Sequence, residues 1–297
     1  MIADRRFDYG RDLELRGDLA GAADLFMQAI ELAPDFASAW FALGDVCERQ
    51  GDKAGAIDAF RRAKAANSVD FLGADLRLLR LTGGSLAAMS RHYVTTLYDK
   101  YAPKFEQSLV GELGYCGPVL LFDAVSAACE TNSRALRFHR CIDLGCGTGL
   151  AARAFADVVE EFIGIDLSAE MIKRARATGL YAALATADAI EGLRKQADAS
   201  ADLVIAADMM IYIHDLAPLF GEAARVLKRG GLFAFTAETH DGDGVTLGAG
   251  LRFAQSAAHL RELLDTAGFI VERIDNASIR TEREVPVPSL VMVASKS

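Results

Sequence analysis

The sequence predicts an α/β domain with a doubly wound, mostly parallel sheet, preceded by a small all-α module. Three observations carry this prediction. From residue 140 onwards, short apolar runs alternate with amphipathic helical patterns, as in parallel sheets covered by helices. The first of these runs leads into a glycine-rich turn at residues 145–149. The first eighty residues instead show helical patterns that repeat with a period of 34.

The N-terminal repeat becomes visible when the chain is laid on itself with a shift of 34. The matching pairs are Gly10 with Gly44, Gly17 with Gly51, Ala22 with Ala56, Phe26 with Phe60, and Ala29 with Ala63. This period, with small residues where two helices cross and an aromatic residue in the second helix, resembles the tetratricopeptide repeat. We expect two repeats and a capping helix within residues 1–82. The apolar residues of that further helix are Phe71, Leu72, Leu76, Leu79 and Leu81.

The repeat module admits two readings. The resemblance implies a groove that binds a peptide, and thus a protein partner. A pair of repeats falls short of the usual minimum of about three, which favours a packing, self-association or lid role instead. Both readings stay open at the level of sequence.

A cluster of helix breakers, Thr82-Gly83-Gly84-Ser85, places the domain boundary. We expect the second domain over residues 85–297, with a helical lid segment over residues 85–135. Aromatic side chains recur there at helical spacing, and Pro103 interrupts the run. A second helix is expected at 118–130, because Pro118 suits a helix start.

Composition excludes several classes of partner. The chain has 32 Lys and Arg against 41 Asp and Glu, a net charge of −9. Such a surface is a poor partner for nucleic acid or anionic membranes. The five cysteines form no C-x-x-C pair, so we expect reduced thiols, no disulfide and no metal site. No apolar run approaches ~20 residues and the N-terminus lacks a signal-peptide core, so we expect a cytoplasmic protein.

The glycine-rich turn follows a strand at residues 141–144 and should open a helix over residues 150–159. A dinucleotide fingerprint, G-x-G-x-x-G/A, needs a small residue at its sixth position, where this chain has Leu150. The spacing of Gly145, Gly147 and Gly149 instead resembles motif I of the class I S-adenosylmethionine-dependent methyltransferases. That resemblance implies a Rossmann-like sheet of seven strands, mostly parallel, with an antiparallel last strand.

Acidic residues at later strand ends extend the resemblance. Asp166 ends the second strand, 21 residues after Gly145, where a carboxylate can accept two ribose hydroxyls. The third strand, 181–185, leads to Asp188 and Ala189, which in the family hold the adenine edge. The resemblance implies S-adenosylmethionine as cofactor, S-adenosylhomocysteine as product, and a cofactor site made of Asp143, Gly145, Cys146, Gly147, Thr148, Gly149, Asp166, Leu167, Met171, Asp188, Ala189, Ala207, Asp208 and Tyr101.

The segment after the fourth strand, 202–206, is where the family places the methyl acceptor. Neither the Asn/Asp-Pro-Pro-Tyr/Phe motif of DNA amino-group methylases nor a Pro-Cys motif is present at residues 207–215. Its apolar residues favour a small organic acceptor. The next helix should end at residues 228–231, where cations suit the negative pole and glycine follows. After a strand at 232–237, a glycine-rich loop at 241–250 is placed to line the acceptor site.

Whether methyl transfer needs a catalytic base depends on the acceptor atom. An alcohol or a protonated amine needs a base, whereas a thiolate or carboxylate does not. His214, His240 and Tyr212 are the candidate catalytic residues, with His214 first because histidine titrates near neutral pH. The leading hypothesis is a methyltransferase acting on a small molecule. The alternatives are a protein methyltransferase whose repeats recruit the substrate, and a non-catalytic protein that binds the cofactor or a nucleotide.

Overall fold

The computed structural model describes residues 2–70, 72–83, 89–106, 113–248, 250–282 and 284–297. The chain divides into two compact units, Met1–Tyr93 and Val94–Ser297. The boundary expected at residues 82–85 precedes this division, and residues 84 and 85 lie outside the described ranges. Within those ranges, no helix is both long and apolar enough to cross a membrane.

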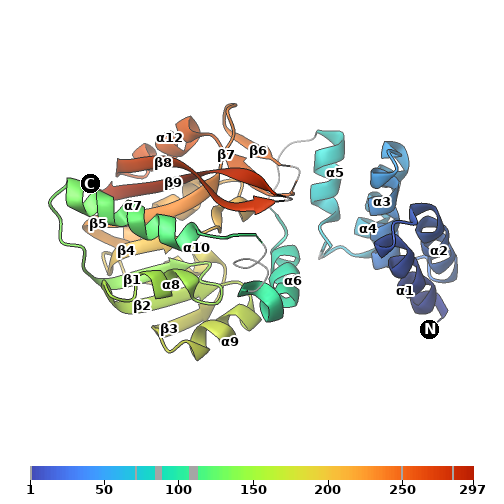
Figure 1. Ribbon diagram of the computed structural model, residues 1–297, viewed down its shortest axis with the longest axis horizontal. Coiled ribbons are helices and arrows are strands. Elements are labelled where there is room, and N and C mark those ends of the chain that lie inside the picture. The colour runs from blue at the N-terminus through green and yellow to red at the C-terminus, as the bar shows by residue number, and fades with distance from the viewer. Residues whose placement is uncertain (1, 71, 84–88, 107–112, 249, 283) are drawn as a thin grey trace. The chain divides into compact units, whose positions relative to one another are not determined.

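The first unit consists of helical hairpins (Figure 1). Asp18 and Asp52 begin the second helix of each hairpin, where their carboxylates accept the backbone N–H of Gly21 and Gly55. Such caps satisfy amides that have no partner within the helix. The helices are α1 (Ile2–Leu15), α2 (Leu19–Leu32), α3 (Ala37–Arg49), α4 (Lys53–Ala66) and α5 (Ala74–Thr82).

The small residues of the 34-residue period lie where paired helices cross. A Cβ on Gly10 would stand 2.6 Å from the ring of Phe26, and one on Gly44 would stand 2.7 Å from that of Phe60. Both phenylalanine rings are fully buried. Helix α5 packs on the second hairpin through Ala74, with Leu78 and Leu81 against the same cluster. Helix α5 therefore packs on the second hairpin, and Phe71 lies outside the described residues.

The second unit alternates strands and helices (Figure 1). Helix α6 (Arg91–Tyr101) contains the division between the units and passes into a short 3-10 turn, Ala102–Lys104, beside Pro103. The remaining helices are α7 (Gly117–Thr131), α8 (Leu150–Ala154), α9 (Ala169–Ala177), α10 (Ala189–Arg194), α11 (Ala217–Val226) and α12 (Ala257–Thr266), with a 3-10 turn at Met210–Tyr212. The strands are β1 (Phe138–Leu144), β2 (Val159–Asp166), β3 (Tyr181–Thr186), β4 (Ala201–Ala206), β5 (Leu227–Glu238), β6 (Val245–Leu247), β7 (Phe253–Gln255), β8 (Phe269–Glu282) and β9 (Val285–Lys296).

Seven of these strands form one sheet, in the order β3-β2-β1-β4-β5-β9-β8. The pairs β1–β2, β2–β3, β1–β4 and β4–β5 are parallel. Strand β9 runs antiparallel to both of its neighbours, β5 and β8. This order confirms the predicted sheet with its antiparallel last strand. It also puts the carboxyl ends of β1, β2 and β4 at one edge, where ligands bind in open α/β sheets.

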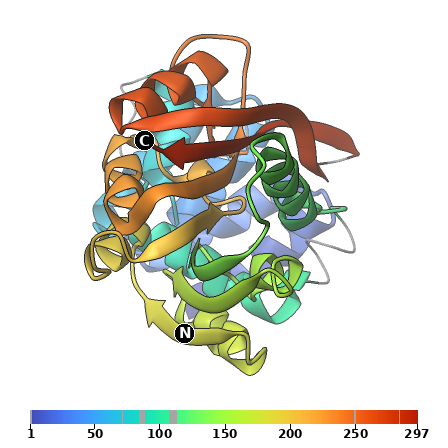
Figure 2. The same ribbon diagram turned by 90° about the vertical axis from the view of Figure 1, so that its left-hand side faces the viewer.

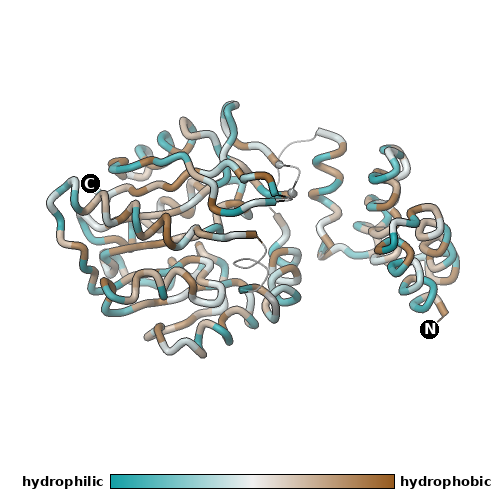
Figure 3. Tube along the Cα trace, in the orientation of Figure 1, coloured by the Kyte–Doolittle hydropathy of each residue, from teal (hydrophilic) through white to brown (hydrophobic). Residues whose placement is uncertain are grey.

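Two apolar cores lie on opposite faces of the sheet. Helices α10, α11 and α12 pack on one face against residues such as Ile142, Val204 and Phe233. Helices α7 and α8 pack on the other face against Cys141, Leu203 and Leu232, the alternate residues of the same strands. Figure 2 shows the helices on either side of the stacked strands, and Figure 3 shows the strands as largely hydrophobic. The period-2 alternation of strand side chains produces both cores.

Three sequence-based expectations need correction. Helix α8 ends at Ala154, and Val159 begins β2 rather than ending the helix. Residues 228–231 do not terminate α11, because the strand β5 begins at Leu227 and its pairing with β4 shifts register there. Part of the expected loop at 241–250 is ordered as β6, which pairs with β7. In each case short-range residue chemistry suggested a helix or loop, but strand pairing satisfies the backbone instead.

The long β8–β9 hairpin continues past the parallel strands. The chain just before α7 pairs with its outer edge: Cys116 N–H donates to the carbonyl of Ile279 at 2.9 Å, and Thr281 N–H donates to that of Leu113 at 2.9 Å. These bonds cover an otherwise open edge of β8. They also hold Tyr115 beside the carboxyl ends of the central strands.

The helix crossings of the first unit give a stability prediction. Glycine within a helix usually costs about 0.5–1 kcal/mol relative to alanine, so a Gly→Ala change should stabilise. At Gly44 the added methyl meets the buried ring of Phe60, and we expect Gly44→Ala to destabilise by about 1–3 kcal/mol. Gly221→Ala in α11, where the new Cβ meets nothing within 4 Å, is the matched control. Chemical unfolding followed by circular dichroism measures both, and a stabilised Gly44→Ala variant would contradict the packing.

Candidate active site

The turn after β1 adopts a conformation that glycine permits. Gly145, Gly147 and Gly149 all have positive φ, at 64°, 52° and 92°. The N–H groups of Gly145 and Cys146 donate to the carbonyl of Ile165 at 2.8 and 3.1 Å, so the turn is tied to β2. Side chains at these positions would strain the backbone, and at Gly145 a Cβ would stand 2.7 Å from Met209. The turn therefore presents bare backbone at the edge of the sheet.

Asp166 joins the glycine turn to the end of β2. Its Oδ2 accepts the N–H of Gly147 at 2.8 Å, and its Oδ1 accepts the N–H of Ser168 at 2.8 Å. Burial raises the pKa of this carboxyl, although the two N–H donors act in the opposite direction. Each oxygen keeps a lone pair for a ligand. The glycine turn and Asp166 are thus in direct contact, and the predicted ribose contact of Asp166 stays a prediction.

Asp143 lies beneath the turn, in the last part of β1, and is almost fully buried. Its Oδ2 accepts the hydroxyl proton of Tyr181 at 2.7 Å. The pKa of Asp143 is raised from 3.8 to about 7, chiefly by burial; the Tyr181 hydrogen bond lowers this pKa and the negative charge of Asp166 raises it. The neighbouring thiol of Cys146 is buried, and burial raises its pKa well above the ordinary value. A buried neutral thiol is a poor nucleophile.

The other predicted cofactor residues surround this turn to different degrees. Thr148 is buried and its Oγ1 has no hydrogen-bond partner, although it lies within the turn. Met171 is fully buried in the first turn of α9, and Ser168 caps that helix by accepting its N–H at 3.1 Å. Asp188 caps α10 instead, where its Oδ1 accepts the N–H groups of Ile190 and Glu191. Leu167 directly follows the end of β2, and Ala189 is the first residue of α10.

Helix α6 covers the same edge of the sheet. Asp99 accepts the hydroxyl proton of Ser168 at 2.5 Å, which attaches the helix to the start of α9. Tyr98 and Tyr212 have their hydroxyl oxygens 2.6 Å apart. The ring of Phe105 would be 3.8 Å from a Cβ on Gly147. Tyr101, one of the predicted cofactor residues, is 43% exposed, whereas Tyr98 contacts Tyr212; the role of Tyr101 stays a prediction.

Ion pairs gather at the ends of β4 and β5. Asp208, at φ 56°, binds Arg280 of β8 through an Nη1–Oδ1 contact of 2.5 Å. Arg280 also pairs with Glu238, which in turn binds Arg252 at 2.5 Å. Glu282 pairs with both arginines. Two guanidinium groups thus pair with three carboxylates. We call these five residues the arginine–carboxylate network: Asp208, Glu238, Arg252, Arg280 and Glu282.

The network sets the proton affinity of Asp208. Burial raises the pKa of its carboxyl to about 6, and the guanidinium of Arg280 acts against this rise. Among the described residues, Arg280 is the hydrogen-bond partner of Oδ1 and none binds Oδ2. The pKa values of Tyr212, Tyr98 and Tyr115 are raised by burial first, and the charge of Asp208 adds to each rise. These three phenols therefore stay protonated at neutral pH.

The candidate catalytic histidines have different surroundings. His240 has both ring nitrogens engaged within its own loop: Nδ1 accepts the N–H of Gly242 at 3.1 Å, and Nε2 lies 3.2 Å from the carbonyl of Gly244. His214 is half-buried, and its ring centroid lies 5.7 Å from that of Phe253. Tyr212 shares the strand-end region with Asp208 and contacts Tyr98. Tyr212 is thus the candidate that the structure brings beside the network.

Sequence reasoning missed Arg252, Glu238 and Arg280. Their positions in the chain carry no motif, because Arg280 lies 72 residues after Asp208 and on a different strand. The one available signal is that Glu238 ends a predicted strand, as Asp166 does. Among the residues that the structure describes, no group of three or more His, Cys, Asp or Glu side chains could hold a metal ion. The expectation of a metal-free site stays a prediction.

Family comparisons agree with this geometry. Residues 142–235 match the family model for a methyltransferase domain, and residues 8–70 match that for a tetratricopeptide repeat. The chain joins a methyltransferase domain to tetratricopeptide repeats. The matched methyltransferase segment runs from β1 into β5, so it contains the glycine turn, Asp166 and Asp208.

Related proteins carry the same domain. A protein named as a probable S-adenosylmethionine-dependent methyltransferase, from Mycolicibacterium smegmatis, is 32% identical over 143 residues, which cover 45% of this chain and 55% of that protein. A ubiquinone biosynthesis O-methyltransferase of Xylella fastidiosa is 36% identical over 152 residues, covering 50% and 61%. The chain thus spans little more than half the length of these curated relatives.

A solved structure shows the same fold. The 1,6-didemethyltoxoflavin-N1-methyltransferase of Burkholderia thailandensis superposes with a TM-score of 0.54 at 17% identity, covering 72% of this chain and 93% of that one. At this identity the likeness concerns the fold alone.

The raised pKa of Asp143 gives a prediction about pH and stability. The folded protein holds this proton up to about pH 7, whereas the unfolded chain releases it near the ordinary value of 3.8. The stabilising contribution is therefore complete below pH 3.8 and is lost as pH rises through 7. Relative to wild type, Asp143→Asn should gain stability over this range by up to about 1.4 kcal/mol per pH unit. Urea unfolding at pH 5 and pH 8 measures this, and a difference independent of pH would contradict it.

Proposed function

We propose that the C-terminal unit is an S-adenosylmethionine-dependent methyltransferase that acts on a small molecule. The observation that carries this proposal is the contact between Gly147 N–H and the Asp166 carboxylate, inside a segment that matches a methyltransferase domain. This contact joins a turn whose backbone a ligand can approach closely to Asp166, the acid at the end of the next strand. This combination suits a nucleoside whose ribose hydroxyls donate to Asp166.

The residues present fit S-adenosylmethionine. The backbone at Gly147 is open to a ligand, because a Cβ there would come no closer than 3.8 Å to the ring of Phe105. The buried Thr148 Oγ1 is a hydrogen-bonding atom without a partner among the described residues. Asp143, Asp166 and Asp208 place carboxyl groups around the site, and the ring of Tyr98 packs against those of Phe105 and Tyr212 nearby. Carboxylates and aromatic rings both suit a positively charged ligand. When bound, the cofactor would supply an already activated methyl group. The protein would therefore orient the cofactor and the acceptor and accept the proton that the acceptor loses.

The acceptor side is formed by Asp208, Tyr212 and Tyr98. In the tyrosine pair one hydroxyl donates to the other, so one hydroxyl proton remains for a third group. Asp208 Oδ2 is free to accept the proton that an alcohol or amine loses on methylation. The arginines at this site are already paired with carboxylates, so they give no free cation to an anionic acceptor. These features favour an uncharged small acceptor with a hydroxyl or amino group.

A protein methyltransferase is the second candidate. The tetratricopeptide match over residues 8–70 supports it, because such repeats commonly bind other proteins. The small-molecule reading ranks first because curated relatives include ubiquinone biosynthesis O-methyltransferases.

Cofactor binding gives the first test. We expect Asp166→Ala to weaken S-adenosylmethionine binding by at least about 100-fold, because both ribose hydrogen bonds are charge-assisted. Asp157→Ala, which removes an exposed acid of the same unit, should leave affinity unchanged. Isothermal titration calorimetry of the full chain measures both. If the wild-type protein shows no binding heat with S-adenosylmethionine, both methyltransferase hypotheses are wrong. Unchanged affinity in Asp166→Ala would refute the ribose contact.

The acceptor gives the second test. Incubating the full chain with cell extract and methyl-labelled cofactor should label small metabolites, whereas a labelled protein band would favour the second candidate. The labelling rate should rise with pH through about 6, as Asp208 becomes a carboxylate able to accept a proton. Asp208→Asn should abolish that rise, and Tyr212→Phe should reduce the rate about tenfold or more. A pH profile in Asp208→Asn that matches wild type would exclude Asp208 as the proton acceptor.

A further inference from the structure

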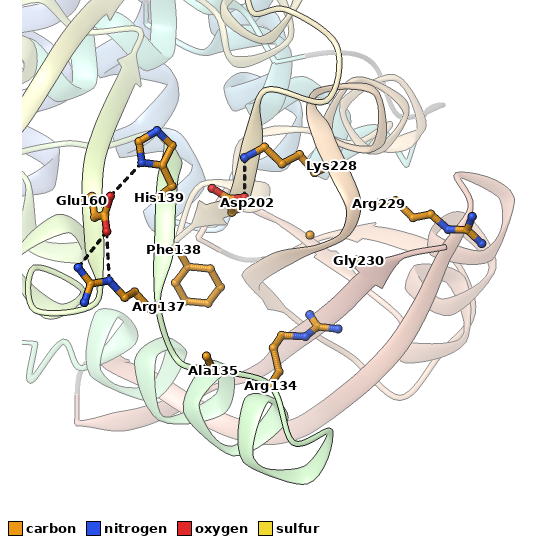
Figure 4. A pocket seen from close by; sticks show the side chains of 11 residues that line it. Arg134, Ala135, Arg137, Phe138, His139, Glu160, Asp202, Lys228, Arg229 and Gly230 are labelled. Carbon is orange, nitrogen blue, oxygen red and sulfur yellow. Dashed lines mark hydrogen bonds and ion pairs between the residues drawn. The ribbon is translucent and has the colours of Figure 1, made fainter.

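A second cavity lies at the opposite end of the central strands, where β1 and β4 begin (Figure 4). Its volume is about 460 Å³, within the usual range of ligand sites. Five segments line it: the connection from α7 to β1, the starts of β1, β2 and β4, and the register shift of β5. The lining residues are Arg134, Ala135, Arg137, Phe138, His139, Glu160, Asp202, Lys228, Arg229, Gly230 and Gly231.

The carboxylates of this cavity are already occupied. Glu160 binds Arg137 at 2.9 Å through Oε1 and His139 at 3.0 Å through Oε2. Asp202 binds Lys228 at 2.8 Å through Oδ1 and accepts the N–H of Arg140 through Oδ2. Four arginine and lysine residues and two carboxylates thus belong to the lining, an excess of two positive charges. This excess contrasts with the net charge of −9 on the whole chain. The side chain of Arg229 is exposed, and in Figure 4 it points away from the other labelled residues.

Arg134 and Arg229 supply that excess. No described carboxylate pairs with either of them, and Arg134 Nη1 is a buried donor without a hydrogen-bond partner. Buried donors are rarely left without a partner in folded proteins unless an ion, water or ligand meets them. The backbone holds Arg134 in place, because its N–H donates to the carbonyl of Cys129 at 2.8 Å where α7 ends. In Figure 4 its side chain points across the cavity towards Gly230.

The glycines of β5 keep the cavity open. Gly230 has φ 74°, and a Cβ there would meet nothing within 4 Å. The residues that were expected to end a helix, 228–231, therefore form one wall with two cationic side chains and little bulk. Strand β1 has seven residues and separates this cavity from the glycine turn by about 20 Å. The cavity is thus distinct from the proposed methyl-transfer site.

We propose that this cavity binds the phosphate group of a small phosphorylated metabolite. Its excess of two positive charges matches a phosphate dianion, and the planar fork of Arg134 can bind two phosphate oxygens at once. A cavity of about 460 Å³ has room for more than the phosphate group itself. An alternative role for Arg134, in which it only faces the negative carboxyl end of α7, requires no ligand.

Phosphorus NMR of the full chain tests the proposal, with inorganic phosphate and glucose 6-phosphate titrated at constant ionic strength in sodium chloride. Both should bind saturably at or below about 1 mM. Arg134→Gln and Arg229→Gln should each weaken binding by about tenfold or more, because each removes a charge-assisted hydrogen bond. Arg261→Gln, an exposed arginine of α12, is the matched control and should not change the affinity.

Three results would overturn the proposal: no saturable phosphate binding by the wild-type chain, equal weakening in Arg261→Gln, or competition by succinate with the same affinity as phosphate. If Arg134→Gln fails to fold, Arg229→Gln decides, since its side chain is exposed, and unchanged affinity there is also an overturning result. Binding of S-adenosylmethionine should be the same in both variants and in wild type. That measurement separates failure of this proposal from failure of the proposed methyl transfer.

Discussion

The hydrogen bond from Gly147 N–H to the Asp166 carboxylate is the contact on which the site depends. It forms only if β1 and β2 are parallel neighbours whose carboxyl ends coincide, and if the turn after β1 adopts positive φ at three glycines. The sheet then continues on the other side of β1 with β4, so the chain reverses its direction of winding at this point. Such a reversal leaves a crevice above the strand ends. The ligand site is thus a consequence of strand order.

Charge is distributed unevenly around this crevice. The side beneath the glycine turn holds Asp143 and Asp166, whose pKa values burial raises. The side at the ends of β4 and β5 holds the arginine–carboxylate network, where two guanidinium groups keep three carboxylates close together. Because the network draws Arg280 from the β8–β9 hairpin, it also fixes that hairpin over the strand ends. A single set of ion pairs therefore supports the local fold and sets the protonation of Asp208.

The two ends of the parallel strands differ in chemistry. Acids and phenols gather at the carboxyl ends around the arginine–carboxylate network. The amino ends of β1 and β4 have Arg134, Arg137, Lys228 and Arg229 nearby. A strand separates its two ends by about 20 Å, so charges of opposite sign can coexist with little mutual cancellation in solution of physiological ionic strength. This separation is compatible with the two sites proposed above, one for a cation and one for an anion.

The sequence by itself determined the parts that depend on local spacing. The 34-residue period predicted the helical hairpins, and the alternation of apolar runs predicted the sheet. The same alternation put Asp166 at the end of the strand next to the glycine turn. Local chemistry misled where strand pairing competed with it, as at residues 228–231, whose cations and glycines also suit the end of a helix.

Only the tertiary structure decided which distant side chains meet. Arg280 reaches Asp208 across 72 residues, and Tyr98 reaches Tyr212 across 114, so no local pattern could have indicated either contact. Likewise, the contact of Tyr98 with Tyr212 and the exposure of Tyr101 depend on how α6 is rotated on the sheet, because residues three apart in a helix can differ in exposure. The reason is physical: spacing along the chain specifies backbone geometry over one or two elements, whereas the packing of whole layers specifies which charges and rings share a buried site.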